Sequence, residues 1–265
     1  MEIMTHDDVF LRYSKVEGEG DIWFIHGFGE SGLSFVEAFD SPLADKFNLY
    51  MPDFPGFGVS PHRPGSETIV DSTEVLCGLI NDISKAKDAP TKAKDTPIFL
   101  VGHSLGGIIG TWTAERLSDK VRGYVSIEGN LTKADTFATS LAMGYEDPKA
   151  FHELLSGIIT SQIAENILFR RVLSSLMLAH PSALLTWGKS CVEATGETKS
   201  GEEFIALDAK TLYIWGDESI PDMTKDFVFE NEINNREIKG AGHWVMVDKS
   251  EECYRAIFEF FSTSV

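Results

Sequence analysis

Hydrophobic positions along the chain follow two different spacings. Apolar residues that recur every three or four positions predict amphipathic helices, and they do so in residues 68–85, 104–117 and 251–261. Short, mostly apolar runs predict strands, and they occupy residues 9–13, 21–26, 47–51, 98–101, 121–127 and 211–215. Strands that alternate with longer helices are typical of parallel sheets with crossover helices. We therefore predict an α/β protein with a mostly parallel central sheet and helices on both faces.

Residues 131–204 interrupt this alternation, because they show helical spacing and no convincing strand. Their large apolar residues, among them Phe137, Leu155 and Leu173, outnumber those that one amphipathic helix can bury. Several helices are therefore expected to pack together and onto the sheet, with some side chains lining a pocket. We predict an α/β core of residues 1–130 and 205–265 and an inserted helical cap of residues 131–204, called the cap segment below.

The balance of charges narrows the range of partners. Among 265 residues, 41 are acidic and 23 are basic, so the formal net charge is −18 at pH 7. An acidic surface repels the phosphates of nucleic acids and anionic lipid headgroups. A hydrophobic content of 43% is enough to bury a core. We expect a globular protein that binds a small molecule, with no nucleic-acid or membrane partner, and the oligomeric state stays open.

The spacing of cysteines and histidines indicates neither a disulfide framework nor a metal site. Three cysteines cannot pair completely and form no CxxC motif, so they are interpreted as reduced packing residues: Cys77, Cys191 and Cys253. The isolated histidines are interpreted as structural: His6, His62, His152 and His180. The N-terminal residues lack the basic and apolar regions of a signal peptide, and no apolar run is long enough to span a membrane. The expectation is a cytoplasmic protein that needs no metal and no organic cofactor.

A candidate nucleophile lies between a predicted strand and a predicted helix. Residues 102–106 read Gly-His-Ser-Leu-Gly and directly follow the apolar run 98–101. A nucleophilic serine on a sharp, strained turn needs neighbours without side chains, so that the chain can bend and a substrate can approach. Free amides and the dipole at a helix N-terminus also favour developing negative charge. We therefore predict that Ser104 is a catalytic nucleophile.

At this point the chain resembles the α/β-hydrolase family, and the resemblance covers nearly its whole length. Residues 26–31, His-Gly-Phe-Gly-Glu-Ser, are similar to the family's oxyanion loop. Residues 53–60, Asp-Phe-Pro-Gly-Phe-Gly-Val-Ser, are similar to its D-x-P-G-x-G-x-S turn, which is mostly scaffold. Residues 240–244, Gly-Ala-Gly-His-Trp, resemble its late histidine loop.

The resemblance implies roles for individual residues. His243 comes after Ser104 in the chain, as the family order requires, and is expected to act as general base. The backbone amides of Phe28 and Leu105 are expected to form an oxyanion hole. His26 and His103 belong to two of the motifs as positioning residues.

The family uses a catalytic triad of a serine, a histidine and an acid. The chain departs from the family pattern at the position of the acid. In most members an Asp stands three positions after the glycine that ends the late strand, and here that position holds Ser219. Asp217 and Asp222 are the neighbouring alternatives. Glu128 directly follows the apolar run 121–127, which places it at the carboxyl edge of the sheet, where open α/β sites lie. We favour Glu128 as the orienting acid, with Asp217 and Asp222 kept as alternatives.

These residues together predict a cofactor-independent serine hydrolase. The expected reaction is cleavage of a carboxylic ester of a small, apolar, uncharged substrate through an acyl-enzyme. Related members of the fold lead to alternatives: a lactonase, a C–C bond hydrolase, or a ligand-binding member without catalysis. A serine at the elbow argues against haloalkane dehalogenases and epoxide hydrolases of this fold, which use Asp there.

Overall fold

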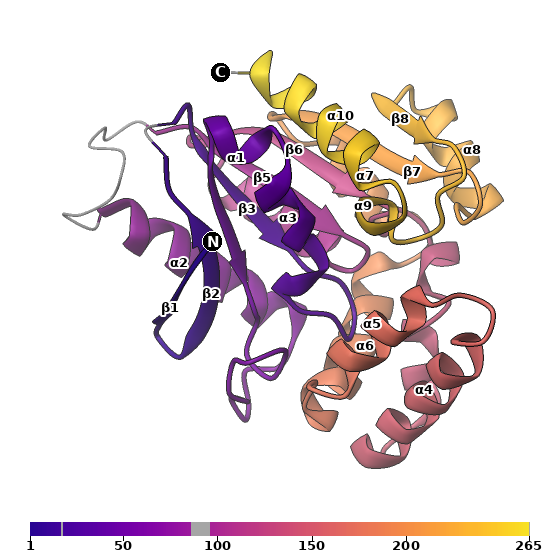
Figure 1. Ribbon diagram of the computed structural model, residues 1–265. Coiled ribbons are helices and arrows are strands. Elements are labelled where there is room, and N and C mark those ends of the chain that lie inside the picture. Colours follow the sequence, from indigo (N-terminus) through magenta and orange to yellow (C-terminus); the bar gives the residue numbers. More distant parts are fainter. Residues whose placement is uncertain (17, 86–95, 265) are drawn as a thin grey trace.

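The computed structural model describes residues 1–16, 18–85 and 96–264. An eight-stranded sheet forms its centre, with the strand order β1-β2-β4-β3-β5-β6-β7-β8 (Figure 1). The strands are β1 (Glu2–His6), β2 (Val9–Ser14), β3 (Asp21–Ile25), β4 (Asn48–Pro52), β5 (Ile98–His103), β6 (Val121–Ile127), β7 (Lys210–Gly216) and β8 (Asn235–Ile238). Every predicted strand is present, and the two edge strands β1 and β8 are additional.

The direction of the strands places one functional edge on the sheet. Strand β2 pairs antiparallel with β1 and β4, whereas the strands from β4 to β8 in the spatial order pair parallel. All residues of β3 and β5 are buried, because helices cover both faces of a parallel sheet. The carboxyl ends of the parallel strands share one edge, where Phe28, Ser104 and Glu128 follow β3, β5 and β6 and His243 follows β8.

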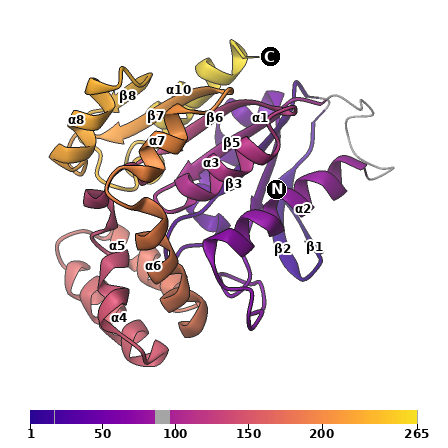
Figure 2. The ribbon, with the colours of Figure 1, turned by 180° about the vertical axis from the view of Figure 1, so that it is seen from behind.

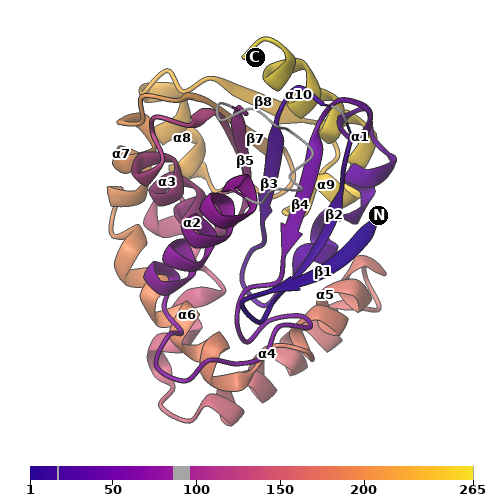
Figure 3. The ribbon, with the colours of Figure 1, turned by 90° about the vertical axis from the view of Figure 1, so that its left-hand side faces the viewer.

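Helices cover both faces of the sheet (Figure 3). One face carries α2 (Ile69–Lys85) and α3 (Gly106–Arg116), and the other carries α1 (Leu43–Lys46), α9 (Val245–Asp248) and α10 (Ser250–Ser262). Two buried apolar clusters correspond to the two faces: Ile80 and Ile109 belong to the first, and Ile257 and Phe261 to the second. The predicted fold class, a mostly parallel sheet with helices on both faces, is confirmed.

The chain between β6 and β7 contains helices and no strand, and every residue of this stretch is described. Its helices are η2 (Lys133–Thr136), η3 (Thr139–Gly144), α4 (Pro148–Gln162), α5 (Leu168–Leu176), α6 (Pro181–Thr195) and α7 (Lys199–Ile205). Two further helices lie outside it: η1 (Gly32–Asp40) and α8 (Asp222–Glu230). Helices α4, α5 and α6 group beside the sheet (Figures 1 and 2), whereas α7 contacts α3. The division into core and cap segment stays a prediction.

The cysteines are buried as free thiols at Cys77, Cys191 and Cys253, in agreement with a packing role. Burial raises the pKa of Cys191 to about 11, so this thiol stays protonated at neutral pH. Within the described ranges, no helix has both the length and the apolar composition needed to cross a bilayer.

Candidate active site

Ser104 occupies a strained turn between β5 and α3. Its φ of 53° lies in the left-handed region, which costs a residue with a side chain about 1–2 kcal/mol. The turn is tight: a Cβ atom at Gly102 would lie 2.5 Å from the carbonyl oxygen of Gly106. A Cβ atom at Gly106 would overlap the backbone of Ile25. Both glycines of the motif are therefore required by close backbone approach, and the structure holds the serine in a conformation that local sequence preference does not favour.

His243 and Glu128 meet across the carboxyl edge of the sheet. Nδ1 of His243 lies 3.3 Å from Oε2 of Glu128. The Glu128 side chain is 3% exposed and that of His243 is 17% exposed. A carboxylate at Nδ1 favours the tautomer that carries its proton there, which leaves Nε2 as a free base. Ser104 and His243 line the same pocket.

Glu128 is held in place at several points. Its other oxygen, Oε1, accepts a hydrogen bond of 2.7 Å from the amide of Gly216. Its own amide donates to the carbonyl oxygen of Ile214 at 2.8 Å, on the neighbouring strand β7. Its φ of 47° is again in the left-handed region. A buried carboxylate needs partners for both oxygens, and the site supplies a backbone amide for one and an imidazole for the other.

The alternative acids lie elsewhere. Asp217 is exposed, and its Oδ1 accepts a hydrogen bond of 2.6 Å from the amide of Gly240. Asp222 is the exposed first residue of α8. Ser219, which stands at the usual position of the acid, lines the pocket. In the part of the chain that the structure describes, neither aspartate forms a hydrogen bond or ion pair with His243, so the geometry brings only Glu128 to the imidazole.

The proposed oxyanion donors belong to two adjacent turns. Phe28 lies in a turn closed by a hydrogen bond of 3.3 Å from the amide of Glu30 to the carbonyl oxygen of Gly27. Leu105 immediately precedes α3, with helical backbone angles. Among the described residues, no acceptor is bound by the amide of Phe28 or by that of Leu105. Two free amides in these turns fit an oxyanion hole, and that role stays a prediction.

His26 and the turn at residues 53–60 form the scaffold that the resemblance implied. His26 is fully buried, and burial lowers its pKa. Its Nε2 accepts a hydrogen bond of 3.2 Å from the amide of Phe54. Asp53 accepts hydrogen bonds from Arg12 at 2.6 Å and from the amide of Gly32 at 2.8 Å. The contacts of Asp53 with Gly32 and of His26 with Phe54 therefore connect the loop after β3 to the turn after β4.

A buried network beneath the histidine loop was not expected from the sequence. Oε1 of Glu30 lies 3.0 Å from Nδ1 of His103 and accepts a hydrogen bond of 2.8 Å from the indole of Trp244. The other ring nitrogen of His103, Nε2, lies 2.9 Å from the carbonyl oxygen of His243. His103 thus has an acceptor at each ring nitrogen, as a doubly protonated imidazole requires.

The charges in this network are coupled. Burial alone would raise the pKa of Glu30, but the charge and hydrogen bond of His103 lower it to about 2. Burial alone would lower the pKa of His103, yet the Glu30 carboxylate raises it above its ordinary value. The result is a buried ion pair whose cation holds the backbone of His243. Glu30 is a lone acidic residue in a glycine-rich loop, which is the one sequence signal of this network.

The pocket over Ser104 has a volume of about 480 Å³ and a mostly apolar lining. Its apolar lining residues come mainly from the cap segment: Phe137, Leu141, Leu155, Ile158, Ile159, Leu168, Phe169, Val172 and Leu176. Ser104 and His243 line the same pocket, and its other polar lining residues include Gln162 and Asn166 of the cap segment. This arrangement suits a small apolar molecule with one polar reactive group.

The comparisons with known proteins agree with this architecture. The family model described as alpha/beta hydrolase fold matches residues 22–250. A pimeloyl-[acyl-carrier protein] methyl ester esterase from Vibrio atlanticus (strain LGP32) is 30% identical over 116 residues. That match covers 43% of this chain and 39% of the relative, so it spans less than half of either protein.

Solved structures match nearly the whole chain at low identity. A thermophilic esterase from Thermogutta terrifontis has a TM-score of 0.73 and 19% identity, covering 97% of this chain and 94% of its own. The N-acyl homoserine lactonase AidH has a TM-score of 0.73 and 18% identity, covering 100% of this chain and 98% of its own. These likenesses show the fold, and the family match spans both Ser104 and His243. The chain belongs to the alpha/beta hydrolase fold family.

Proposed function

We propose that this protein is a serine hydrolase that cleaves carboxylic esters of small, apolar, uncharged substrates. The observation that carries the proposal is the buried Glu128 carboxylate 3.3 Å from Nδ1 of His243, in a pocket that His243 shares with Ser104. A serine in a strained turn and an imidazole oriented by a carboxylate are the parts that acyl transfer needs.

The proposed reaction has two halves. Oγ of Ser104 attacks the ester carbonyl carbon while Nε2 of His243 takes its proton, and the amides of Phe28 and Leu105 stabilise the oxyanion. The intermediate collapses, and His243 returns the proton to the leaving alkoxide, which leaves an acyl group on Ser104. Water then attacks the acyl group as His243 removes its proton. The acid departs, and Ser104 regains its hydrogen.

The substrate class follows from the pocket and from the charges around it. An apolar lining favours an uncharged acyl or alkyl group. A substrate that carries a negative charge would find no partner for that charge in this lining. The cap segment, residues 131–204, has six Lys or Arg and nine Asp or Glu residues. An acidic carrier protein would meet like charge there. We therefore favour a free small ester over an acyl group tethered to an acidic protein. The buried free thiols of the three cysteines support a cytoplasmic location.

The test combines covalent labelling with turnover of p-nitrophenyl esters. Ser104→Ala is expected to lose fluorophosphonate labelling and at least about 10³-fold in kcat, because a triad nucleophile is removed. Ser174→Ala is the matched control, since Ser174 is exposed on α5 and its hydroxyl, among the described residues, bonds only to the carbonyl oxygen of Arg170. Circular dichroism checks that both variants fold.

Each outcome bears on the proposal directly. Labelling that persists in Ser104→Ala contradicts the assignment of the nucleophile. A wild-type protein that takes up no fluorophosphonate and turns over no ester contradicts catalysis and favours a ligand-binding member of the family. A panel that also contains lactones and ring-fission ketones identifies the bond that is cleaved, because all are acyl carbonyls within reach of the same serine.

A further inference from the structure

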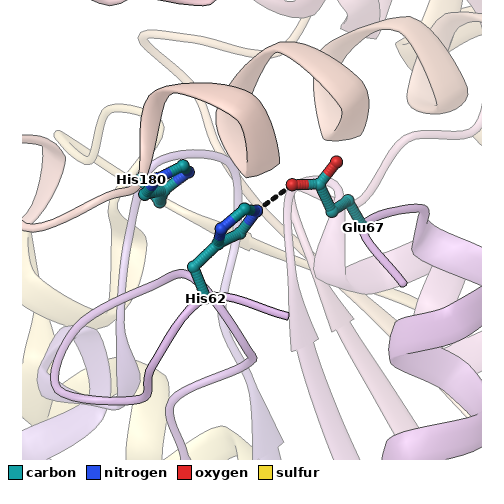
Figure 4. Close-up of side chains that lie close together, drawn as sticks. All are labelled: His62, Glu67 and His180. Carbon is teal, nitrogen blue, oxygen red and sulfur yellow. Dashed lines mark hydrogen bonds and ion pairs between the residues drawn. The ribbon is translucent and has the colours of Figure 1, made fainter. Parts of the chain in front are cut away.

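Two histidines and a glutamate meet where the cap segment touches the core, away from the proposed active site. His62 and Glu67 lie in the loop between β4 and α2, and His180 is the residue that caps the N-terminus of α6. Figure 4 shows the two imidazole rings face to face, with the Glu67 carboxylate at the edge of the His62 ring. The ring centroids are 3.6 Å apart and the ring planes differ by 10°. None of the three residues lines the pocket over Ser104.

The potential ligand atoms of this cluster are close together. One nitrogen of each imidazole and one carboxylate oxygen of Glu67 all lie within 4.8 Å of one another. Nε2 of His62 and Oε1 of Glu67 are already in direct contact. Ligand atoms bound to one tetrahedral Zn²⁺ at about 2.0–2.1 Å are separated by roughly 3.4 Å. The two rings are stacked, so their in-plane nitrogen lone pairs run side by side, and the rings must turn before both nitrogens can bind one ion.

The backbone around the cluster is fixed by contacts between core and cap segment. The amide of His180 donates to the carbonyl oxygen of Gly56 at 2.7 Å, and the amide of Gly56 donates to that of Pro61 at 3.1 Å. Gly56 has a φ of 84°, and a Cβ atom there would lie 2.7 Å from Cβ of Ala183 on α6. The loop around Pro61 and the start of α6 are thus packed backbone to backbone, so the side chains of His62 and His180 are presented from a rigid base.

One ring nitrogen of His180 has a free lone pair. Nδ1 of His180 accepts a hydrogen bond of 3.3 Å from the amide of Ser182, so the neutral ring carries its proton on Nε2. An ion bound at Nδ1 would replace this hydrogen bond. The side chains of His62 and Glu67 are 19% and 17% exposed, so an ion can enter from solvent.

We propose that His62, Glu67 and His180 form a binding site for one borderline divalent cation, such as Zn²⁺, Co²⁺ or Ni²⁺. Two imidazoles and one carboxylate bind Zn²⁺, Co²⁺ or Ni²⁺ in preference to Mg²⁺ or Ca²⁺, which favour sites made of oxygen ligands alone. The bound ion joins α6 to the loop before α2 and so ties the cap segment to the core. Its role is structural, because the residues of the proposed triad lie elsewhere.

The protein contains a second, weaker cluster that serves as a control. His6, Asp7 and Asp82 also lie within ligand distance of one another, but they offer a single imidazole, and both carboxylates are exposed. An exposed acidic group is well solvated and binds such ions weakly. His6→Ala therefore removes the competing cluster and leaves the proposed site untouched.

The experiment is a titration of EDTA-treated, dialysed protein with ZnCl₂ by calorimetry, repeated with CoCl₂ by visible absorption. One site per chain is expected, together with a thermal unfolding midpoint that rises with Zn²⁺ concentration. Glu67→Gln and His180→Asn are expected to weaken binding at least about tenfold. Both substitutions preserve shape or capping: Gln is isosteric with Glu, and Asn is a strong N-cap residue. Ester turnover is expected to be insensitive to EDTA.

Three results would overturn the proposal. The first is no saturable binding below about 1 mM Zn²⁺, a range that corresponds to only ~4 kcal/mol of binding free energy. The second is unchanged affinity in both Glu67→Gln and His180→Asn, and the third is loss of the bound ion in His6→Ala. Because binding is measured without turnover, failure here leaves the proposed serine chemistry untouched. Failure of that chemistry likewise leaves this site untouched.

Discussion

The acid of the proposed triad makes the sharpest test, because the structure separates Glu128 from its rival Asp217. Glu128→Gln keeps an acceptor oxygen for the amide of Gly216, which now bonds to Oε1 at 2.7 Å. The amide nitrogen of the new side chain then faces Nδ1 of His243, which lies 3.3 Å from Oε2 in the native protein. That nitrogen donates, so Nδ1 must accept, and the imidazole carries its proton on Nε2. The base would be blocked at Nε2, the atom that takes the proton of Ser104 in the proposed reaction.

The expected loss follows from this change of tautomer. The corresponding substitution in a serine protease lowers kcat by about 10⁴, or ~5 kcal/mol. We expect Glu128→Gln to lower kcat by at least about a hundredfold, ~2.7 kcal/mol. Asp217→Asn changes only the exposed contact to the amide of Gly240 at 2.6 Å, so its kcat is expected to fall by less than about tenfold, ~1.4 kcal/mol.

The assay is steady-state hydrolysis of p-nitrophenyl butyrate by both variants, with thermal unfolding as the check on folding. The reasoning is refuted if Asp217→Asn loses more activity than Glu128→Gln, because the acid then belongs to the loop after β7. Small losses in both variants would point to Asp222 or to a Ser–His dyad. A Glu128→Gln protein that unfolds near the assay temperature is replaced by Glu128→Asp, whose carboxylate keeps its charge, and kcat is compared again.

Two further predictions concern the network and the pocket. Glu30→Gln should lower the unfolding free energy at pH 7 by about 3 kcal/mol, because it leaves one partner of a buried pair uncompensated. The pKa of Glu30 is about 2, below the ~4.3 of an unfolded Glu. The stabilisation by the ionised carboxylate is therefore fully present above pH ~4.3 and is lost as the pH falls towards 2. Denaturant unfolding between pH 7 and pH 3 checks it, and a difference from wild type that stays constant with pH contradicts it. Leu141→Trp should shift preference towards shorter acyl chains: Leu141 lines the pocket and is 39% exposed, and the ratio of kcat/KM for butyrate over octanoate esters should rise roughly tenfold, ~1.4 kcal/mol. An unchanged ratio would mean that the acyl group binds elsewhere.

Much of the fold could be predicted from the sequence, because central strands need apolar residues on both faces. Strands β3 and β5 are buried throughout and, apart from Asp21 and His103 at their ends, are apolar for that reason. Edge strands carry no such requirement: in β1, Glu2–His6, none of the residues is fully buried, and in β8 only Ile238 is. These two strands gave no readable pattern, because solvent satisfies their outer face.

Features of the site that depend on neighbours in sequence could be predicted, whereas contacts between residues far apart in sequence could not. The strained turn at Ser104 was predictable because the glycines that it requires are neighbours of Ser104 in sequence, and the role of Ser104 as nucleophile stays a prediction. Glu30 pairs with His103, 73 positions away, and with Trp244, 214 positions away. His62 and His180 are 180 − 62 = 118 positions apart. Such pairs exist only because the helices and loops pack as they do, and no spacing rule within a single sequence encodes that packing.

The left-handed backbone at Ser104 and Glu128 implies a trade-off between stability and activity. The two residues directly follow the neighbouring parallel strands β5 and β6, with φ of 53° and 47°. Glycine adopts this region freely, so Ser104→Gly should relieve about 1 kcal/mol of strain, while the proposed nucleophile disappears. Evolution towards greater thermal stability would thus favour an inactive protein at this position, and only selection for turnover keeps a side chain there. The difference in unfolding free energy between Ser104→Gly and Ser104→Ala measures the strain that a side chain causes at this position. Equal values would show that the turn is unstrained.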